Sequence, residues 1–247
     1  MKKLINALLW IRQYIFYVYH YLALAIFSII NHVFFLCKAP YALRSKTAQL
    51  NSWVTRLGIF WILWVRFEVE GKENISKVPC IYVCKHQAEW ETVVMPSIIS
   101  RTCYVAKKEL LDMPVLGWGL KAIEYIPVDR SAGLKAFKTV ISEGKNRLAR
   151  NISIVIFPEG TRVAPGEHPK FHKSAMSLAK ATKVPVIPIA HNAGSCWPAS
   201  RTALIRPGKI TLSIGEPIEN TGNIDEVTET SYQWIKAKVE QLEKVSA

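Results

Sequence analysis

Cysteines are few in this sequence, and their spacing does not fit a metal site or a disulfide framework. The 247 residues contain five cysteines, and no two of them form a CxxC pair. We therefore expect neither zinc nor structural disulfides, and a reducing, cytosolic setting is the simplest interpretation. Internal repeats and low-complexity segments are also absent, which excludes a repeat protein and a disordered tract.

Acidic residues are scarce relative to basic ones. Nineteen Asp and Glu stand against 32 Lys and Arg, so the formal net charge is +13. Such an excess favours an anionic partner: nucleic acid, an acidic membrane surface, a phosphorylated substrate or an acidic protein. Because the basic residues are dispersed along the whole chain and no nucleic-acid-binding motif occurs, nucleic acid is not an expected partner.

Charged side chains are missing altogether from residues 14–36. About 20 apolar residues in a helix cross the hydrocarbon core of a bilayer. Four tyrosines crowd one end of the segment, as in an interfacial aromatic belt. A cleaved signal peptide fits poorly, because the segment is too long and no small-residue cleavage site follows it. A buried core helix is the alternative.

A second apolar patch, residues 57–65, is too short to span a bilayer alone. Its aromatic residues suit the headgroup boundary. We interpret residues 1–66 as a helical membrane-docking module. Basic residues flank the 14–36 segment on both sides, so the positive-inside rule gives no clear orientation. Whether that segment spans the bilayer or lies within one leaflet stays open.

From Phe67 the pattern changes to alternating strands and helices, which predicts an α/β catalytic domain over residues 67–247. We expect a mixed central sheet with helices on both faces. Ser131, Ser174 and Asp225 are predicted N-caps. The predicted strands cover 67–70, 80–84, 102–105, 124–128, 152–157, 186–191 and 209–214, and the predicted helices cover 91–99, 131–149, 174–182 and a final stretch from 225.

Two chemically unusual segments follow predicted strands. Phe157 to Arg162 reads FPEGTR after an apolar strand, and His86 follows the strand that ends at Cys84. In such a loop, backbone N–H groups, Thr161 and Arg162 can converge on one anion, most naturally a phosphate. Ligands of open α/β sheets bind at the carboxyl ends of strands. A base and an anion site at two strand ends indicate an enzyme that acts on a phosphorylated alcohol.

Four motif blocks in this order resemble the 1-acylglycerol-3-phosphate acyltransferases, the lysophosphatidic acid acyltransferases of glycerophospholipid synthesis. The resemblance covers roughly Phe67 to Glu219. The family usually has Asp where this chain has Glu91, and a bacterial subgroup with Glu at that position and an HNAG segment is the nearest look-alike. The blocks are His86–Glu91, Tyr125–Arg130, Phe157–Arg162 and Val184–Ile189, with Val105–Leu110 and His191–Gly194 as flanking matches.

This resemblance implies transfer of a fatty acyl group from a thioester to the position-2 hydroxyl of 1-acylglycerol 3-phosphate, which gives phosphatidate. The donor is acyl-CoA or acyl carrier protein, a co-substrate, and no cofactor or metal is expected. The partners implied are lysophosphatidic acid, the acyl thioester and anionic membrane lipid, at the cytoplasmic face of the inner membrane. Acylation of another lyso-lipid, such as a lyso-ornithine lipid or lysophosphatidylglycerol, and non-enzymatic binding of anionic lipid are the alternatives.

His86 and Glu91 are the predicted catalytic residues. An unperturbed imidazole pKa of about 6.5 suits a general base near neutral pH. A carboxylate on the other ring nitrogen fixes the tautomer, and Glu91 is preferred to Glu89 because it occupies the family position. The chain has no GxSxG motif. Cys84 is a less favoured covalent nucleophile, since its strand position suits a core thiol.

The phosphate-binding residues are predicted from family position and chemistry. Arginine grips phosphate in bidentate fashion, which suits the two arginines in the motif blocks. Glu159 is unexpected beside a phosphate and is interpreted as binding the glycerol part or holding Arg162. Lys108 competes with Lys107 for the family lysine. The predicted set is Lys107, Arg130, Glu159, Gly160, Thr161 and Arg162.

Overall fold

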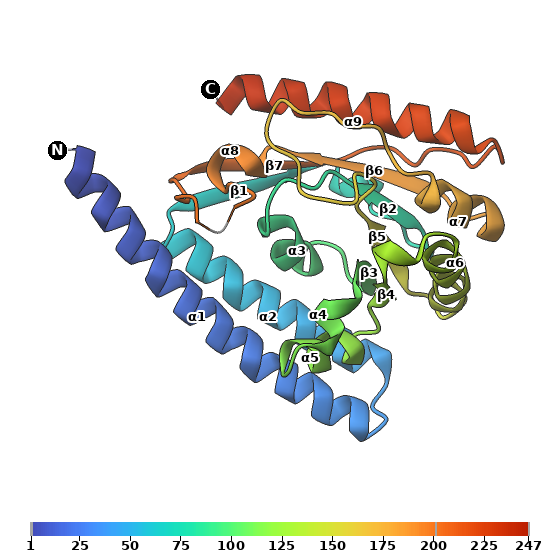
Figure 1. Cartoon of the computed structure of the whole chain (residues 1–247), viewed down its shortest axis with the longest axis horizontal. Helices are drawn as coiled ribbons and strands as arrows, with labels where there is room; N and C mark the ends of the chain where they lie inside the picture. The colour runs from blue at the N-terminus through green and yellow to red at the C-terminus, as the bar shows by residue number, and fades with distance from the viewer. Residues whose placement is uncertain (1, 201, 247) are drawn as a thin grey trace.

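Two long helices open the chain and lie side by side (Figure 1). The computed structural model describes residues 2–200 and 202–246, apart from the side chains of Arg130 and Ser246. Helix α1 runs over Lys2–Leu36 and α2 over Tyr41–Trp61. Pro40 occupies the N-cap of α2 with an extended backbone, which ends one helix and starts the next.

The sheet has seven strands in the order β1-β7-β6-β2-β5-β3-β4. All neighbours pair in parallel except β6 and β7, which are antiparallel. The predicted mixed sheet is therefore confirmed. Strands β2 and β6 are buried along their whole length, as expected for strands covered on both faces. The strands are β1 Val65–Glu70, β2 Ile81–Cys84, β3 Thr102–Lys107, β4 Ile126–Val128, β5 Ser153–Ile156, β6 Val186–His191 and β7 Gly208–Ile214.

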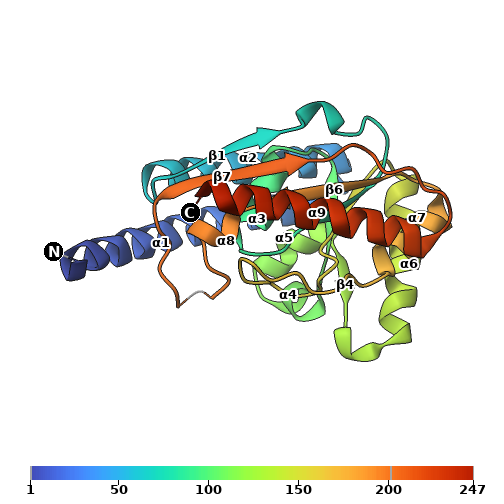
Figure 2. The ribbon, with the colours of Figure 1, turned by 90° about the horizontal axis from the view of Figure 1, so that it is seen from above.

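Helices cover both faces of this sheet, as predicted. On one face lie α6 (Leu134–Ala149), α7 (Ser174–Thr182) and α9 (Ile224–Ser246), and Figure 2 shows α9 running along β6 and β7. On the other face, α1, α2 and α3 (Trp90–Val94) pack over the strands. The remaining short helices are α4 (Lys108–Asp112), α5 (Leu116–Ala122), α8 (Ala193–Cys196) and the 3₁₀ turns Lys72–Asn74, Met95–Ser97 and Arg130–Ala132.

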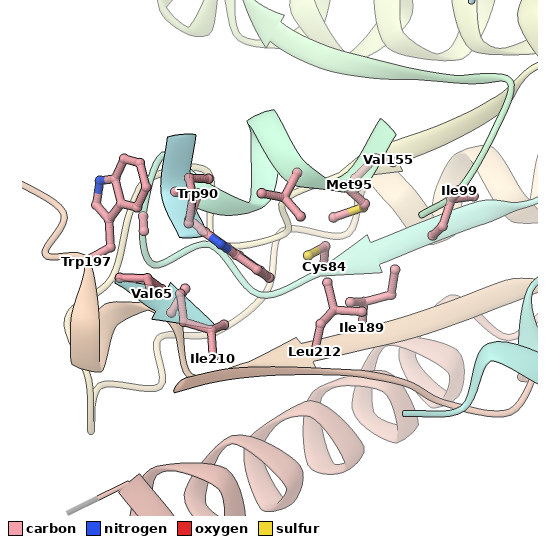
Figure 3. Close-up of a cluster of buried hydrophobic side chains, with 14 of the residues drawn as sticks. Val65, Cys84, Trp90, Met95, Ile99, Val155, Ile189, Trp197, Ile210 and Leu212 are labelled. Atoms are coloured by element: carbon pink, nitrogen blue, oxygen red, sulfur yellow. The ribbon is translucent and has the colours of Figure 1, made fainter. Parts of the chain in front are cut away.

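The first two helices share a hydrophobic core with the sheet. Phe16 of α1 and Ile59 of α2 are fully buried in the same cluster as Trp90. Figure 3 shows Trp90 projecting from α3 toward the strands, with Cys84, Ile189 and Leu212 in the same cluster. The hydrophobic packing is continuous across residues 66 and 67. The predicted boundary between a membrane-docking module and a catalytic domain therefore stays a prediction about what each part does.

Helix α1 is apolar on its outer face and partly polar on its inner face. Its buried residues include Arg12, Gln13, His20 and Asn31. The outer face carries large aliphatic side chains that are half exposed or more, such as Leu22 at 61%. Among the described residues, α1 is the one helix long and apolar enough to cross a membrane. A helix whose outer face contacts water is polar on that face and apolar toward the core, so the polarity of α1 is reversed.

The three predicted helix caps are wrong. Helix α6 begins at Leu134, after Gly133 at φ 48°, and Ser131 lies in a 3₁₀ turn where its N–H donates to Asp129. Ser174 is the first helical residue of α7 rather than its cap. Asn223, not Asp225, accepts the first backbone N–H groups of α9. Each helix start lies in a run of polar residues that could all serve as N-caps. Residue type alone therefore could not identify which of them is the cap.

Candidate active site

The predicted catalytic segments meet at the carboxyl ends of three neighbouring strands. Strand β2 pairs in parallel with β5 on one side and with β6 on the other. The residues that follow these strands, Lys85–His86, Phe157 and Asn192, are therefore brought to one edge of the sheet. This is where ligands of open α/β sheets bind, so the topology alone places three of the four motif blocks together.

His86 and Glu91 form a hydrogen-bonded pair. The distance from His86 Nδ1 to Glu91 Oε1 is 2.7 Å. A proton on Nδ1 donates to the carboxylate and leaves the lone pair on Nε2, which is the arrangement of a general base. The His86 ring stacks on Phe157 with centroids 4.1 Å apart, so its plane is fixed as well.

Glu91 is fully buried in the first turn of α3. Its carboxylate also accepts the backbone N–H groups of Gln87 at 3.0 Å and of Ala88 at 3.1 Å. Burial by itself raises the pKa of Glu91, but nearby His191 and His86 outweigh burial and leave that pKa below its ordinary value. The carboxylate is therefore ionised at neutral pH and can stabilise an imidazolium.

His191 supports the pair from the last residue of β6. Its buried ring donates from Nε2 to the Lys85 carbonyl at 2.8 Å and accepts the Ala193 N–H at Nδ1. Burial lowers the pKa of His191, which keeps this ring neutral and in one tautomer. Its Nε2 lies 3.8 Å from Glu91 Oε2, so it bounds the far side of the carboxylate.

A buried ion pair links the base segment to the loop that follows β5. Lys85 Nζ lies 3.1 Å from Glu159 Oε1, and both side chains are almost completely buried. Lys85 also donates to the Glu167 carbonyl, while Glu159 Oε2 accepts the His86 N–H at 3.2 Å. Burial raises the pKa of Glu159, and Lys85 opposes that rise. These contacts tie Glu159 to the base segment rather than to Arg162.

The structure does not bring the predicted phosphate-binding cations with described side chains, Lys107 and Arg162, into one cluster around a common point. Arg162 donates to the Ala199 carbonyl at 3.1 Å, which uses one of its five N–H groups. Lys107 is half exposed and pairs with Glu109. The side chain of Arg130 lies outside the described residues, although its backbone forms the 3₁₀ turn just before α6.

A cavity of about 630 Å³ adjoins the loop. Gly160 and Thr161 form part of its wall, and Gly160 adopts φ 71°, which the tight turn requires. The remaining wall is mainly apolar and comes from β3, β4, β5 and α6, with the polar residues 172–174 at the start of α7. The loop therefore faces an open space that is also lined by Phe157, the ring on which His86 stacks.

Several residues of this site were not assigned a role from the sequence. They are Lys85, Gln87 and His191, together with Glu243 near the chain end. Lys85 and Gln87 flank His86 in the sequence. A lysine directly after a buried strand needs an acidic partner, and this was the signal that could have pointed to Lys85. Glu243 offers no local signal, because its contacts are set by how α9 crosses the sheet.

The similarity to known proteins follows the same region. A family model described as Acyltransferase matches residues 66–192. The 1-acyl-sn-glycerol-3-phosphate acyltransferase of Pseudomonas aeruginosa is 34% identical over 197 residues, covering 78% of this chain and 75% of that protein. The chain belongs to the 1-acyl-sn-glycerol-3-phosphate acyltransferase family.

Two further relatives extend the likeness within this acyltransferase family. The crystal structure of the 1-acyl-sn-glycerophosphate (LPA) acyltransferase, PlsC, from Thermotoga maritima covers 98% of each chain with a TM-score of 0.77 at 25% identity. The 1-acyl-sn-glycerol-3-phosphate acyltransferase of Cocos nucifera is 29% identical over 181 residues, and the match spans 58% of its length. The helices that precede the sheet are thus part of the shared architecture.

Proposed function

We propose that this acyltransferase moves a fatty acyl group from an acyl thioester to the position-2 hydroxyl of 1-acylglycerol 3-phosphate, giving phosphatidate. The observation that carries the mechanism is the His86–Glu91 pair at 2.7 Å, with the carboxylate buried and the ring partly accessible. The Glu at position 91 and the HNAG segment favour the bacterial subgroup. Acyl-CoA and acyl carrier protein both supply the required thioester.

The reaction needs two proton transfers, one from the acceptor hydroxyl to His86 and one from His86 to the leaving thiolate. His86 Nε2 removes the proton of the acceptor hydroxyl, and the oxygen attacks the thioester carbonyl to give a tetrahedral intermediate. The intermediate collapses, the carbon–sulfur bond breaks, and the thiolate leaves as the ester forms. The imidazolium, held by Glu91, then returns its proton to the thiolate. The products are phosphatidate and the free thiol of the carrier.

A covalent route through Cys84 has little support. This cysteine is completely buried, and its Sγ–H donates to the Lys85 carbonyl. Burial raises the pKa of the Cys84 thiol well above its ordinary value, with Glu91 and Glu159 adding to the rise. Because the thiolate is the nucleophilic form, this thiol is inert at neutral pH.

The acceptor phosphate is proposed to bind beside the loop, at Lys107, Arg130, Gly160, Thr161 and Arg162. We assign Glu159 a different task, which is to hold the loop against His86 through the contacts described above. This division leaves the loop backbone, and the Arg162 donors that Ala199 does not use, to face the phosphate. The carboxylate itself is buried and neutralised by Lys85.

Arg162→Lys is expected to raise the KM for lysophosphatidate with a modest change in kcat. The substitution keeps the charge but loses the fork that binds phosphate through two parallel donors. One lost charge-assisted hydrogen bond corresponds to roughly 1.5–3 kcal/mol, or about 10- to 100-fold in affinity. Steady-state kinetics with each substrate varied in turn checks this.

The donor KM serves as the internal control for Arg162→Lys and should stay at its wild-type value. An acceptor that lacks phosphate should be poor for both proteins and insensitive to the change. A rise in the donor KM instead would move Arg162 to the carrier site.

Residues 1–66 are proposed to dock the enzyme on a membrane. Helix α1 contacts α2 and α5 along its length, so one side is occupied by protein while the apolar side is free. A helix held in this way lies along the surface of one leaflet rather than crossing the bilayer. The donor is made in the cytosol, which places the docked face on the cytoplasmic side, and basic flanks favour anionic lipid.

Replacing Ile15, Leu22 and Ile29 with glutamate is expected to release the protein from membranes. All three lie on the outer face of α1, where they are 47–61% exposed. Each loses roughly 1.5–3 kcal/mol of apolar burial in lipid, and the new charges add an unfavourable term. Vesicle co-sedimentation measures the release, and turnover of a monomeric short-chain acceptor should be retained.

The matched control for this triple variant places three glutamates on exposed positions of α9, at Thr230, Gln241 and Lys244. It changes the net charge by a similar amount without touching α1. If the α1 variant remains bound to vesicles, the docking surface lies elsewhere on the protein.

A further inference from the structure

The last turns of α9 reach the segment that carries the proposed base. Glu243 Oε1 accepts a hydrogen bond from Gln87 Nε2 at 2.7 Å. Its other oxygen, Oε2, accepts the Gly166 N–H at 3.0 Å. Figure 1 shows α9 running over the sheet with the loop after β5 rising beside it. One carboxylate near the chain end therefore bridges two segments of the active site.

Gln87 is the neighbour of His86 and is completely buried. Its backbone N–H donates to Glu91 Oε1 at 3.0 Å, and its side-chain Oε1 accepts the Gly194 N–H at 3.1 Å. With the bond to Glu243, the Gln87 amide joins the base segment to the turn after β6 and to α9. A shift of this amide would move the same backbone that carries His86.

The loop side of the bridge also returns to His86. The Val163 N–H, three residues before Gly166, donates to the His86 carbonyl at 2.8 Å. The chain thus closes a circuit from His86 through Gln87 to Glu243, on to Gly166, and back through Val163. The three hydrogen bonds of this circuit are between 2.7 and 3.0 Å long, and the chain itself joins His86 to Gln87 and Val163 to Gly166.

A carboxylate is an unfavourable choice for this position on local grounds. The C-terminal end of a helix carries a partial negative charge, so an acid in the last turns is disfavoured. Its two oxygens can each accept a charge-assisted hydrogen bond, which are shorter and stronger than neutral ones. The local cost together with the two contacts indicates that the position serves the site rather than the helix.

We propose that Glu243 is a positioning residue of the acyltransferase, which sets the placement of His86 by clamping Gln87 and the Gly166 turn onto α9. It touches no substrate in this account and acts through the base segment, so the inference rests on the proposed role of His86. Displacement of a catalytic group by about 1 Å can cost on the order of 100-fold in rate.

The test is a donor–acceptor exchange in the full-length protein, assayed with lysophosphatidate and acyl-CoA. Glu243→Ala should lower kcat roughly 10- to 100-fold with the lysophosphatidate KM unchanged. In Glu243→Gln an amide N–H group faces the amide N–H group of Gln87, and in Gln87→Glu one carboxylate faces another. Each single variant should therefore also lose kcat. The double variant Gln87→Glu/Glu243→Gln restores a donor opposite an acceptor at each contact and should recover most of the wild-type kcat.

Tyr232→Phe is the matched control. Its hydroxyl donates to the His168 carbonyl at 2.9 Å, so this change also loosens the loop on α9 without touching Gln87. Its kcat should stay near wild type, while its thermal stability falls about as much as that of Glu243→Ala.

Three results would overturn the proposal: full activity in Glu243→Ala, no recovery in the exchanged double variant, or an equal loss of kcat in Tyr232→Phe. Each of these leaves the proposed function standing if wild type acylates lysophosphatidate and depends on His86. A wild-type protein with no such activity refutes the proposed function instead.

Discussion

His86→Ala is expected to lower kcat by roughly 10²–10⁴-fold, the range contributed by a positioned general base. The imidazole is the group whose Nε2 faces outward while Nδ1 is held by Glu91 at 2.7 Å. The lysophosphatidate KM should change little, because the ring binds a proton rather than the phosphate. Single-turnover measurements with saturating donor separate the chemical step from product release.

The residual activity of His86→Ala should be measured in protein whose fold is intact. Vesicle binding and thermal unfolding provide the controls for an intact fold. Turnover close to wild type would rule out this mechanism whatever the family relationship.

Lys85→Met is expected to lower the free energy of unfolding by roughly 3–5 kcal/mol, the cost of leaving a buried ionised partner alone. Lys85 and Glu159 are 2% and 0% exposed at their side chains, so water cannot replace the lost contact. The double variant Lys85→Met/Glu159→Gln removes both charges and retains an acceptor for the His86 N–H. It should recover most of the loss.

A double-mutant cycle in urea, with Glu159→Gln as the fourth member, measures the coupling between the two side chains. The exposed Glu216→Gln change is the control for loss of one carboxylate without a buried partner. Additive losses in the double variant would mean that the pair contributes no coupling and that Glu159 is free to serve the acceptor.

Local patterns predicted the strands well because each central strand is a short apolar run ended by a polar motif. The prediction for residues 186–191 coincides with β6, and the other strands differ by one or two residues at their ends. The same runs placed His86 and the FPEGTR loop at strand ends. Glu91 could be paired with His86 because a turn of five residues brings them together without any help from distant elements.

Contacts between distant segments could not be predicted in the same way. Glu159 stands in a conspicuous motif, yet its partner Lys85 lies 74 positions earlier in the sequence. Only the pairing of β2 with β5 brings the two side chains together. The inner face of α1 was equally hidden. A segment without charges predicts contact with lipid, whereas the polar residues that face the protein gain their partners only after α2 is in place.

The shared core of α1, α2 and the sheet has a consequence for how this enzyme can be handled and how it can change. Phe16 of α1 and Ile59 of α2 lie in one core with the strands beneath the proposed base. Removing α1 and α2 would leave the underside of the sheet open to water. If the proposed docking is right, a change of these helices at the bilayer surface also reaches the strands beneath the proposed base.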